Sequence, residues 1–285
     1  MKTRKGITAA IVLSVLIISA LLFAIIYIIR DMGAVPEDVT ETADDGYIRS
    51  DSFDEVMDDA GMDAILEGAD PNAAEEKAPD GWYGAFESSG RPDRVINFTP
   101  YVAKCPDVYA WIEIPGTGID YPIAYCEDAF EPFWFTHDID GNASAAGMII
   151  TDSMNANDLS DPMTLIYGQA PDDGTMLAHL HDFRDAGFFE AHDCINIYMK
   201  DAELVYRIYA CYITSNEHIL VKNDFSDPGS FAEYFDSIKG IRDLSLNIRD
   251  DAKPSYNDHV IALITHCDDE SRRLFVVAVL DEIKF

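Results

Sequence analysis

A cysteine and an arginine lie close together near the end of the sequence, in a setting that suits nucleophilic chemistry. Cys267 closes the apolar run Val260-Ile-Ala-Leu-Ile-Thr-His-Cys, and a second run soon begins with Arg273-Leu-Phe-Val-Val-Ala-Val-Leu. Both runs have the length and composition of buried strands, so we expect the thiol and the guanidinium to meet at the mouth of a sheet. A cation next to a thiol favours the thiolate, which is the nucleophilic form. We therefore predict that Cys267 is a nucleophile.

The elements that must position this pair are mostly strands. Apolar runs of strand length, bounded by turn residues, occupy 111–116, 119–123, 147–151, 164–168, 194–199 and 204–211. Together with the two final runs they give about eight strands, and a closed barrel is the arrangement that removes unpaired strand edges. We predict a mainly β fold built as a closed eight-stranded barrel.

Helices are expected in only three places. Residues 173–183 carry apolar side chains at helical spacing, and so do residues 230–238, where Ser230 is a candidate N-cap. A leading helix within 91–110 is expected to pack on the barrel. The second of these helices would lie in a late connection between strands.

The N-terminal part predicts a membrane anchor. Residues 7–29 are apolar or small, which is the length that spans a bilayer, and Lys2, Arg4 and Lys5 precede them. A cleaved signal peptide has a shorter apolar core of about 7–15 residues. We therefore expect residues 1–6 in the cytoplasm, a single-pass transmembrane helix over 7–29, and the rest of the chain outside the cell.

The charge of the chain is strongly negative. The formal net charge is −32 and the pI is about 4.2, which excludes a nucleic-acid surface because phosphate contacts need a basic face. Acidic residues are concentrated in the early part of the chain, so residues 30–90 are expected to form a disordered stalk. The folded domain is then expected over 91–285.

The five cysteines are an odd number for an external domain. Cys194 and Cys211 flank the expected hairpin, and a turn between Ala202 and Glu203 would place them opposite each other. A cross-strand disulfide and two buried free thiols both fit this spacing.

Several segments resemble class B sortases in the order that the family has them. They are Val108-Tyr-Ala-Trp-Ile-Glu-Ile-Pro-Gly-Thr-Gly-Ile-Asp-Tyr-Pro-Ile, His137-Asp-Ile-Asp-Gly-Asn-Ala-Ser-Ala-Ala-Gly-Met-Ile-Ile-Thr-Asp, Leu165-Ile-Tyr-Gly with Asp173-Gly-Thr-Met, Thr265-His-Cys, and Arg273-Leu-Phe-Val-Val-Ala. The resemblance covers about residues 95–285.

The resemblance implies a sortase-type barrel that acts as a membrane-anchored cysteine transpeptidase of Gram-positive cells. Such enzymes cut a C-terminal sorting signal of a secreted protein, hold the product as a thioacyl-enzyme and pass it to an amine of a cell-wall precursor or a pilin. Cys267 matches the nucleophile and Arg273 matches the arginine that stabilises the oxyanion. Arg272 is the alternative, because the loop from Cys267 to Arg273 is short for the family. We expect no cofactor.

One position departs from the family pattern. Where the family has Tyr-Gly-His, this chain has Tyr167-Gly168-Gln169. A glutamine cannot exchange a proton usefully at neutral pH, and loss of acid–base help typically costs about 10²–10⁴ in rate. The resemblance therefore puts Gln169 at the usual histidine position and predicts impaired turnover.

Other histidines could replace the missing base. His179 and His181 follow Gln169 in the expected helix, and His266 adjoins Cys267 but should face the other way on the strand. A metal site built from His179, His181 and His192 finds no further ligand at suitable spacing. Two hypotheses remain: a transpeptidase that is slow or uses a substitute base, and a degenerate sortase that binds sorting signals or a partner without turnover.

Overall fold

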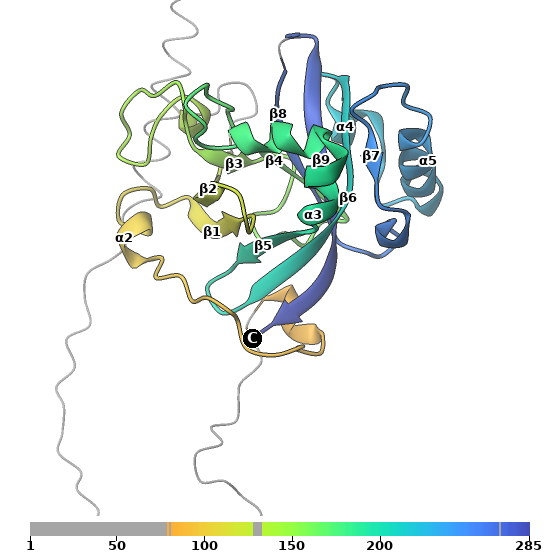
Figure 1. Cartoon of the computed structure of the whole chain (residues 1–285). Coiled ribbons are helices and arrows are strands. Elements are labelled where there is room, and N and C mark those ends of the chain that lie inside the picture. Colours follow the sequence, from red (N-terminus) through yellow and green to blue (C-terminus); the bar gives the residue numbers. More distant parts are fainter. Residues whose placement is uncertain (1–78, 80, 128–132, 268) are drawn as a thin grey trace, which may run out of the picture. The chain divides into compact units, whose positions relative to one another are not determined.

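The fold is a closed barrel of eight antiparallel and parallel strands. The computed structural model describes residues 79, 81–127, 133–267 and 269–285. The strand order is β5-β1-β2-β3-β4-β8-β9-β6-β7, and a further pairing of β5 with β6 closes the first eight (Figure 1). The strands are β1 Val108–Glu113, β2 Asp120–Tyr125, β3 Ile149–Thr151, β4 Met163–Tyr167, β5 Cys194–Tyr198, β6 Glu203–Ser215, β7 Asn247–Ile248, β8 Val260–His266 and β9 Arg272–Lys284. The predicted mainly β barrel is confirmed, and β7 is a two-residue addition to the edge of β6.

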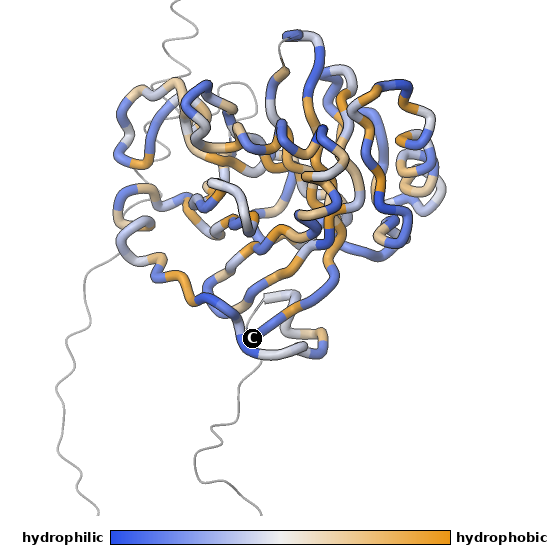
Figure 2. The backbone as a smooth tube through the Cα atoms, in the orientation of Figure 1, coloured by the Kyte–Doolittle hydropathy of each residue, from blue (hydrophilic) through white to orange (hydrophobic). Residues whose placement is uncertain are grey.

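Alternation along β8 and β9 divides their side chains between two hydrophobic clusters. Leu263 and Val276 belong to the interior cluster of the barrel. Their chain neighbours Ile264 and Phe275 belong to an outer cluster. Because successive residues of a strand point to opposite faces, an uninterrupted apolar run is needed when both faces are buried. The central parts of β8 and β9 are accordingly hydrophobic, whereas much of the surrounding loop structure is hydrophilic (Figure 2).

The outer cluster is covered by the long connection between β6 and β8. This connection contains α4 Ile219–Lys222, α5 Pro228–Ile238 and the 3-10 helix η4 Asp250–Ala252, and it lies to one side of the barrel (Figure 1). Phe231 and Phe235 of α5 are buried in that cluster. The predicted helix is present but starts earlier than expected. Asp227, not Ser230, is its N-cap, because the Asp227 carboxylate accepts a hydrogen bond from the Ser230 backbone N–H at 2.7 Å.

The interior cluster is covered by a different helical connection. The 3-10 helix η3 spans Ala178–Arg184 and is followed by α3 Ala186–Ala191. Leu180 and Phe183 of η3 are fully buried in the interior cluster. The helix expected over 173–183 is therefore shorter at its start, and it is a 3-10 helix rather than an α-helix.

The N-terminal part of the domain is largely irregular and is bound to the barrel. The leading helix expected within 91–110 is reduced to α2 Thr99–Val102, and two further 3-10 helices are η1 Trp82–Ala85 and η2 Phe133–Phe135. The Trp82 indole donates to the carbonyl of Asp158 at 2.6 Å, and the Asp93 N–H donates to Glu203 at 2.6 Å.

These contacts move the predicted boundary of the folded domain. Residues 81–90 were expected in the stalk, yet Tyr83 is buried in the interior cluster. The predicted tail over 1–6, the membrane helix over 7–29 and the stalk as far as residue 78 lie outside the described residues. Within the described ranges, no helix has both the length and the apolar character needed to cross a membrane.

The hairpin of β5 and β6 has a different register from the one predicted. Cys194 pairs with Arg207, and Tyr198 pairs with Glu203, so the turn comes two residues earlier than expected. Cys211 lies opposite Val276 of β9 instead. Cys194 and Cys211 are therefore free thiols. Burial raises the pKa of Cys211 to about 12, which keeps this thiol protonated.

Candidate active site

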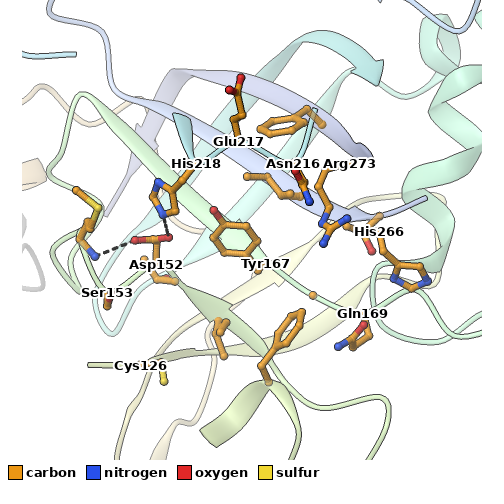
Figure 3. Close-up of a pocket in the computed structure, with 18 of the residues that line it drawn as sticks. Cys126, Asp152, Ser153, Tyr167, Gln169, Asn216, Glu217, His218, His266 and Arg273 are labelled. Carbon is orange, nitrogen blue, oxygen red and sulfur yellow. Dashed lines mark hydrogen bonds and ion pairs between the residues drawn. The ribbon is translucent and has the colours of Figure 1, made fainter. Parts of the chain in front are cut away.

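The predicted site residues gather at one end of the barrel. β4 runs parallel to β8, so both of these strands finish at that end, and the short β3 pairs antiparallel with the end of β4. β6 ends there as β9 begins, with Ser215 opposite Arg272. A cavity of about 700 Å³ opens at this end (Figure 3). It is lined by Cys126, Phe135, residues 150–154, residues 167–169, residues 216–218, Val221, residues 264–266, Arg273 and Phe275.

Arg273 and Arg272 have different surroundings, which separates the two candidates for the oxyanion role. The Arg273 guanidinium lines the cavity and donates to the backbone carbonyls of Glu270 and Arg272, both at 2.9 Å. The Arg272 guanidinium binds the Asp243 carboxylate at 2.7 Å and is not among the residues that line the cavity. Of the two arginines, only Arg273 can therefore meet a ligand in the cavity.

Gln169 shares the cavity with Arg273. It follows β4 directly, and its backbone carbonyl accepts a hydrogen bond from the Leu177 N–H at 2.9 Å. The side chain lies below the Arg273 guanidinium in the view of Figure 3. The position that would hold a histidine by the family pattern therefore reaches the cavity, but with an amide that cannot exchange a proton.

Cys267 approaches this end of the barrel from the other face of the β8–β9 hairpin. It follows β8 directly, is partly buried and packs against the interior cluster, and it is not among the residues that line the cavity. The pKa of the buried Cys211 is raised by burial, lowered by the charge of Arg184 and raised by Cys267. The thiol of Cys267 and the guanidinium of Arg184 therefore both lie within electrostatic reach of Cys211.

The histidines considered as substitute bases have separate environments. His181 of η3 forms a hydrogen bond from Nε2 to the backbone carbonyl of His266 at 3.1 Å. A carbonyl can only accept, so Nε2 carries the proton. His179 binds the Asp182 carboxylate at 2.8 Å. His266 lies opposite Arg273 in the strand pairing and lines the cavity. Of these, His181 is the one bonded to the residue that precedes Cys267.

A histidine–aspartate pair in the cavity wall was missed by the sequence analysis. His218 Nε2 lies 2.7 Å from Asp152 Oδ2, and Asp152 Oδ1 accepts the Met154 N–H at 2.9 Å. Asp152 follows β3 and His218 precedes α4, 66 residues later. Asp152 ends one of the family-like segments, but no local pattern marks His218. Elsewhere in the described residues, no group of three or more potential ligands is placed to hold a metal ion.

Tyr167 lies between the two charged sides of the cavity. Its pKa is raised by burial and by the negative charge of Asp152, and Arg273 opposes that shift. Figure 3 shows the ring with the His218–Asp152 pair on one side and Arg273 on the other. The phenol therefore stays protonated across the physiological range, and the Asp152 carboxylate is the acceptor that it faces.

Comparisons with known proteins agree on one family. The chain is 30% identical over 164 residues to sortase B of Listeria monocytogenes, which covers 58% of this chain and 64% of that protein. It also superposes on a crystal structure of sortase B from Clostridium perfringens with a TM-score of 0.56 and 26% identity, over 65% of this chain and all of that one. The chain is thus similar to class B sortases in both sequence and fold.

Further structures of class B sortases share the fold. The Staphylococcus aureus sortase B–substrate complex has a TM-score of 0.56 at 23% identity, over 65% of this chain and 84% of that one. No family model matches the chain. The chain spans less than two thirds of the length of the Listeria sortase B.

Proposed function

We propose that this chain is a sortase-type cysteine transpeptidase held at the outer face of the cell membrane by residues 7–29. The observation that carries the proposal is the placement of Cys267 and Arg273 at the adjoining ends of β8 and β9, with Arg273 lining a cavity, in a class B sortase fold. Fold alone does not specify an activity, and the proposal therefore depends on these two side chains.

The proposed reaction has two acyl transfers. The Cys267 sulfur attacks the carbonyl carbon of a peptide bond in the sorting signal, that C–N bond breaks, and the leaving amine takes a proton. The peptide is then held as a thioester. An acceptor amine attacks the same carbon, loses a proton, and displaces the thiolate as the new amide forms. In each step negative charge develops on the carbonyl oxygen, where the Arg273 guanidinium would stabilise it.

The proton transfers need a group other than Gln169. His181 is the candidate, because its ring is bonded to the carbonyl that precedes Cys267 and because η3 covers the interior face on which Cys267 packs. With Nε2–H donating to that carbonyl, Nδ1 is the nitrogen that could take or return a proton.

The partners follow from the same proposal. One related structure is a sortase B–substrate complex and another is sortase B complexed with triglycine. By analogy, the cavity of this chain would receive the sorting-signal peptide of a secreted protein. The acceptor would be a primary amine of a cell-wall precursor or a pilin.

A second candidate function is a binding module that retains the cavity without turnover. The observation that favours it is the Gln169 amide, which occupies the cavity beside Arg273 where proton transfer is needed. Such a protein would hold sorting signals, or associate with an active sortase, through the same cavity. The two candidates differ in whether a covalent thioester forms.

The test is covalent capture of a sorting-signal peptide by the full chain in detergent micelles, read by intact-protein mass. We expect a thioester adduct in the wild type and none in Cys267→Ala. His181→Gln should slow adduct formation by about 10²-fold, the lower end of what acid–base help contributes. His179→Gln is the matched control, two residues away on the same helix, and should stay close to wild type.

The pH dependence separates the two functions further. If His181 acts on the thiol, the pH profile of Cys267 alkylation should shift in His181→Gln and not in His179→Gln. Peptide binding without any adduct, at any pH, would reject the transpeptidase and leave the binding module. Equal rates in the two histidine variants would reject His181 as the base while leaving the transpeptidase intact.

A further inference from the structure

Arg273 is a cation without a carboxylate partner in a strongly acidic chain. Its Nη1 donates to the backbone carbonyls of Glu270 and Arg272, and it forms no ion pair within the described residues. By contrast, Arg94, Arg207 and Arg272 each bind a carboxylate at 2.7 or 2.8 Å. The sequence holds 52 acidic residues, so a shortage of carboxylates does not explain the difference. The charge of Arg273 is left to a ligand of the cavity that it lines.

The carboxylates of the cavity wall already have other partners. Asp152 binds His218 at 2.7 Å and also interacts with the phenol of Tyr167. Glu217 binds Lys222 at 2.6 Å. A guanidinium that lines a cavity without a counter-ion of its own favours an anionic ligand at that place.

Two further hydrogen-bond donors lie on the same side of the cavity as the guanidinium. His266 is opposite Arg273 in the pairing of β8 with β9, and directly opposite residues of two strands present their side chains on the same face. Gln169 lies below Arg273 in Figure 3, and both His266 and Gln169 line the cavity. An imidazole donates through a ring N–H, and a glutamine amide donates through its NH₂ group. None of these three side chains is a nucleophile, so together they are suited to hold an anion.

The neighbouring wall of the cavity is apolar, which narrows the class of anion. Phe135, Ile150, Ile264 and Phe275 line it. A ligand that fits both parts carries its anionic group next to an apolar group. A planar carboxylate matches the fork of a guanidinium.

The carboxylate at the end of a peptide meets both requirements. One carbon atom separates it from the side chain of the last residue, so an apolar side chain there can reach the apolar wall while the carboxylate meets Arg273. The carboxylates of aspartate and glutamate lie at the tips of their side chains and have no apolar group beyond them. The C-terminal carboxylate is therefore favoured over a side-chain carboxylate.

We propose that Arg273, His266 and Gln169 form a binding site for the free C-terminal carboxylate of a peptide whose last residue is apolar. This inference rests on the proposed function in one respect, which is that the cavity receives a peptide. It holds whether the chain forms a thioester or only binds. A peptide held in this way occupies the cavity and excludes a sorting signal from it.

The test uses full-length Cys267→Ala in detergent micelles, so that binding is measured without chemistry. A short fluorescent peptide of glycine and alanine that ends in leucine is prepared with a free carboxylate and, as the matched control, with a carboxamide. Anisotropy measures both affinities. We expect the carboxylate to bind about tenfold more tightly, as a charge-assisted contact gives. Salt of about 0.5 M should shrink that difference, because screening weakens a solvent-accessible pair.

Two further peptides distinguish the sources of the carboxylate. One carries an internal glutamate and ends in leucine carboxamide, and the other ends in serine with a free carboxylate. Both should bind more weakly than the leucine carboxylate, because the first lacks the terminal charge and the second lacks the apolar side chain. Equal affinity of the glutamate peptide would show that the site takes side-chain carboxylates and that the C-terminal assignment is wrong.

Variants of the binding residues test the site itself. Arg273→Gln should abolish the preference for the carboxylate, and Arg272→Gln is the matched control, one residue earlier, that should keep it. His266→Gln should reduce the preference by about threefold, within the range that one hydrogen bond contributes. His179→Gln is its control and should have no effect. His266 is exposed, so its variant tests the site even if Arg273→Gln fails to fold.

The outcomes distinguish this inference from the proposed function. Equal binding of carboxylate and carboxamide, or a preference that survives in Arg273→Gln, overturns the carboxylate site and leaves the transpeptidase proposal untouched. A carboxylate preference without covalent adduct in the wild type does the reverse. Failure of all four peptides to bind also overturns the site, whereas covalent capture of a sorting signal decides the proposed function separately.

Discussion

The two faces of the β8–β9 hairpin contribute different things to the same end of the barrel. On the interior face, Cys267 packs against the cluster covered by η3, and His181 of that 3-10 helix is hydrogen-bonded to the carbonyl of the preceding residue, His266. On the outer face, Arg273 opens into a cavity with Gln169 and the His218–Asp152 pair. The interior face has the nucleophile and little space, whereas the outer face has the space and most of the recognition chemistry.

The contrast between the two faces bears on the loss of the histidine at position 169. The substitution at Gln169 removes a proton carrier from the cavity face, but the interior face retains His181 beside the thiol-bearing strand. Acid–base function could therefore have moved from one face of the hairpin to the other without a change of fold. Three measurements test this contrast between the two faces.

The largest expected effect is a gain from Gln169→His. Restoring an imidazole on the cavity face should raise the rate of adduct formation by about 10²-fold, because general acid–base help contributes 10²–10⁴ and His181 would already supply part of it. Rapid-quench mass spectrometry measures the rate. Combining Gln169→His with His181→Gln should keep most of the gain. No gain at all would mean that proton transfer does not limit the reaction.

The next effect separates the two arginines of the hairpin. Arg273→Lys should slow adduct formation by about 10²-fold, since a lysine cannot reproduce the guanidinium contacts at a developing oxyanion. Arg272→Lys is the matched control one residue earlier, and it should change the rate by less than about threefold because Arg272 binds Asp243 outside the cavity. Equal losses in both variants would contradict the assignment of Arg273 to the cavity.

The smallest expected effect concerns the ion pair between Arg272 and Asp243, which keeps the Arg272 side chain out of the cavity. Hydrogen bonds from Ser245 and the contact with Arg272 hold the pKa of Asp243 well below its usual value. The stabilisation is therefore complete above the unfolded pKa of about 3.9, and it is lost as pH falls from there toward the folded pKa. We expect the wild type to exceed Asp243→Asn in stability by less than about 1 kcal/mol at pH 6.

Urea unfolding at a series of pH values measures this difference. The advantage of the wild type over Asp243→Asn should narrow between about pH 4 and pH 2, because protonation of the aspartate removes it. A difference that stayed constant over that range would show that the asparagine acts through packing and not through charge.

The barrel could be predicted from the sequence because its strands are marked by clear local patterns of apolar residues. The apolar runs of β8 and β9 are long and continuous, since both of their faces are buried. The β5–β6 register was missed because several turns fit the same residues, and tertiary pairing with β9 selects one of them. The prediction of a leading helix was wrong for a related reason. Residues before β1 satisfy their polar groups through contacts with the barrel.

The site was predictable only in part. Cys267, Arg273 and Gln169 stand within or next to strands that the sequence marks clearly, and two of the three do line the cavity. The His218–Asp152 pair joins the ends of β3 and β6 across 66 residues, and nothing local to His218 indicates a partner. The separation of thiol and guanidinium onto two faces depends on strand alternation at a short hairpin, which composition does not reveal.

The parallel pairing of β4 with β8 has a consequence for how such a protein can change. Tyr167 lies opposite Ile264, so the two strands deliver positions 169 and 267 to the same end of the barrel however long the intervening chain is. That intervening chain includes His218, α4 and α5, which form part of the cavity wall and the cover of the outer cluster. Insertions, deletions and substitutions in this intervening chain can change the ligand that the cavity recognises. The spacing between positions 169 and 267 stays the same. Recognition and chemistry can thus evolve as separable modules within one domain.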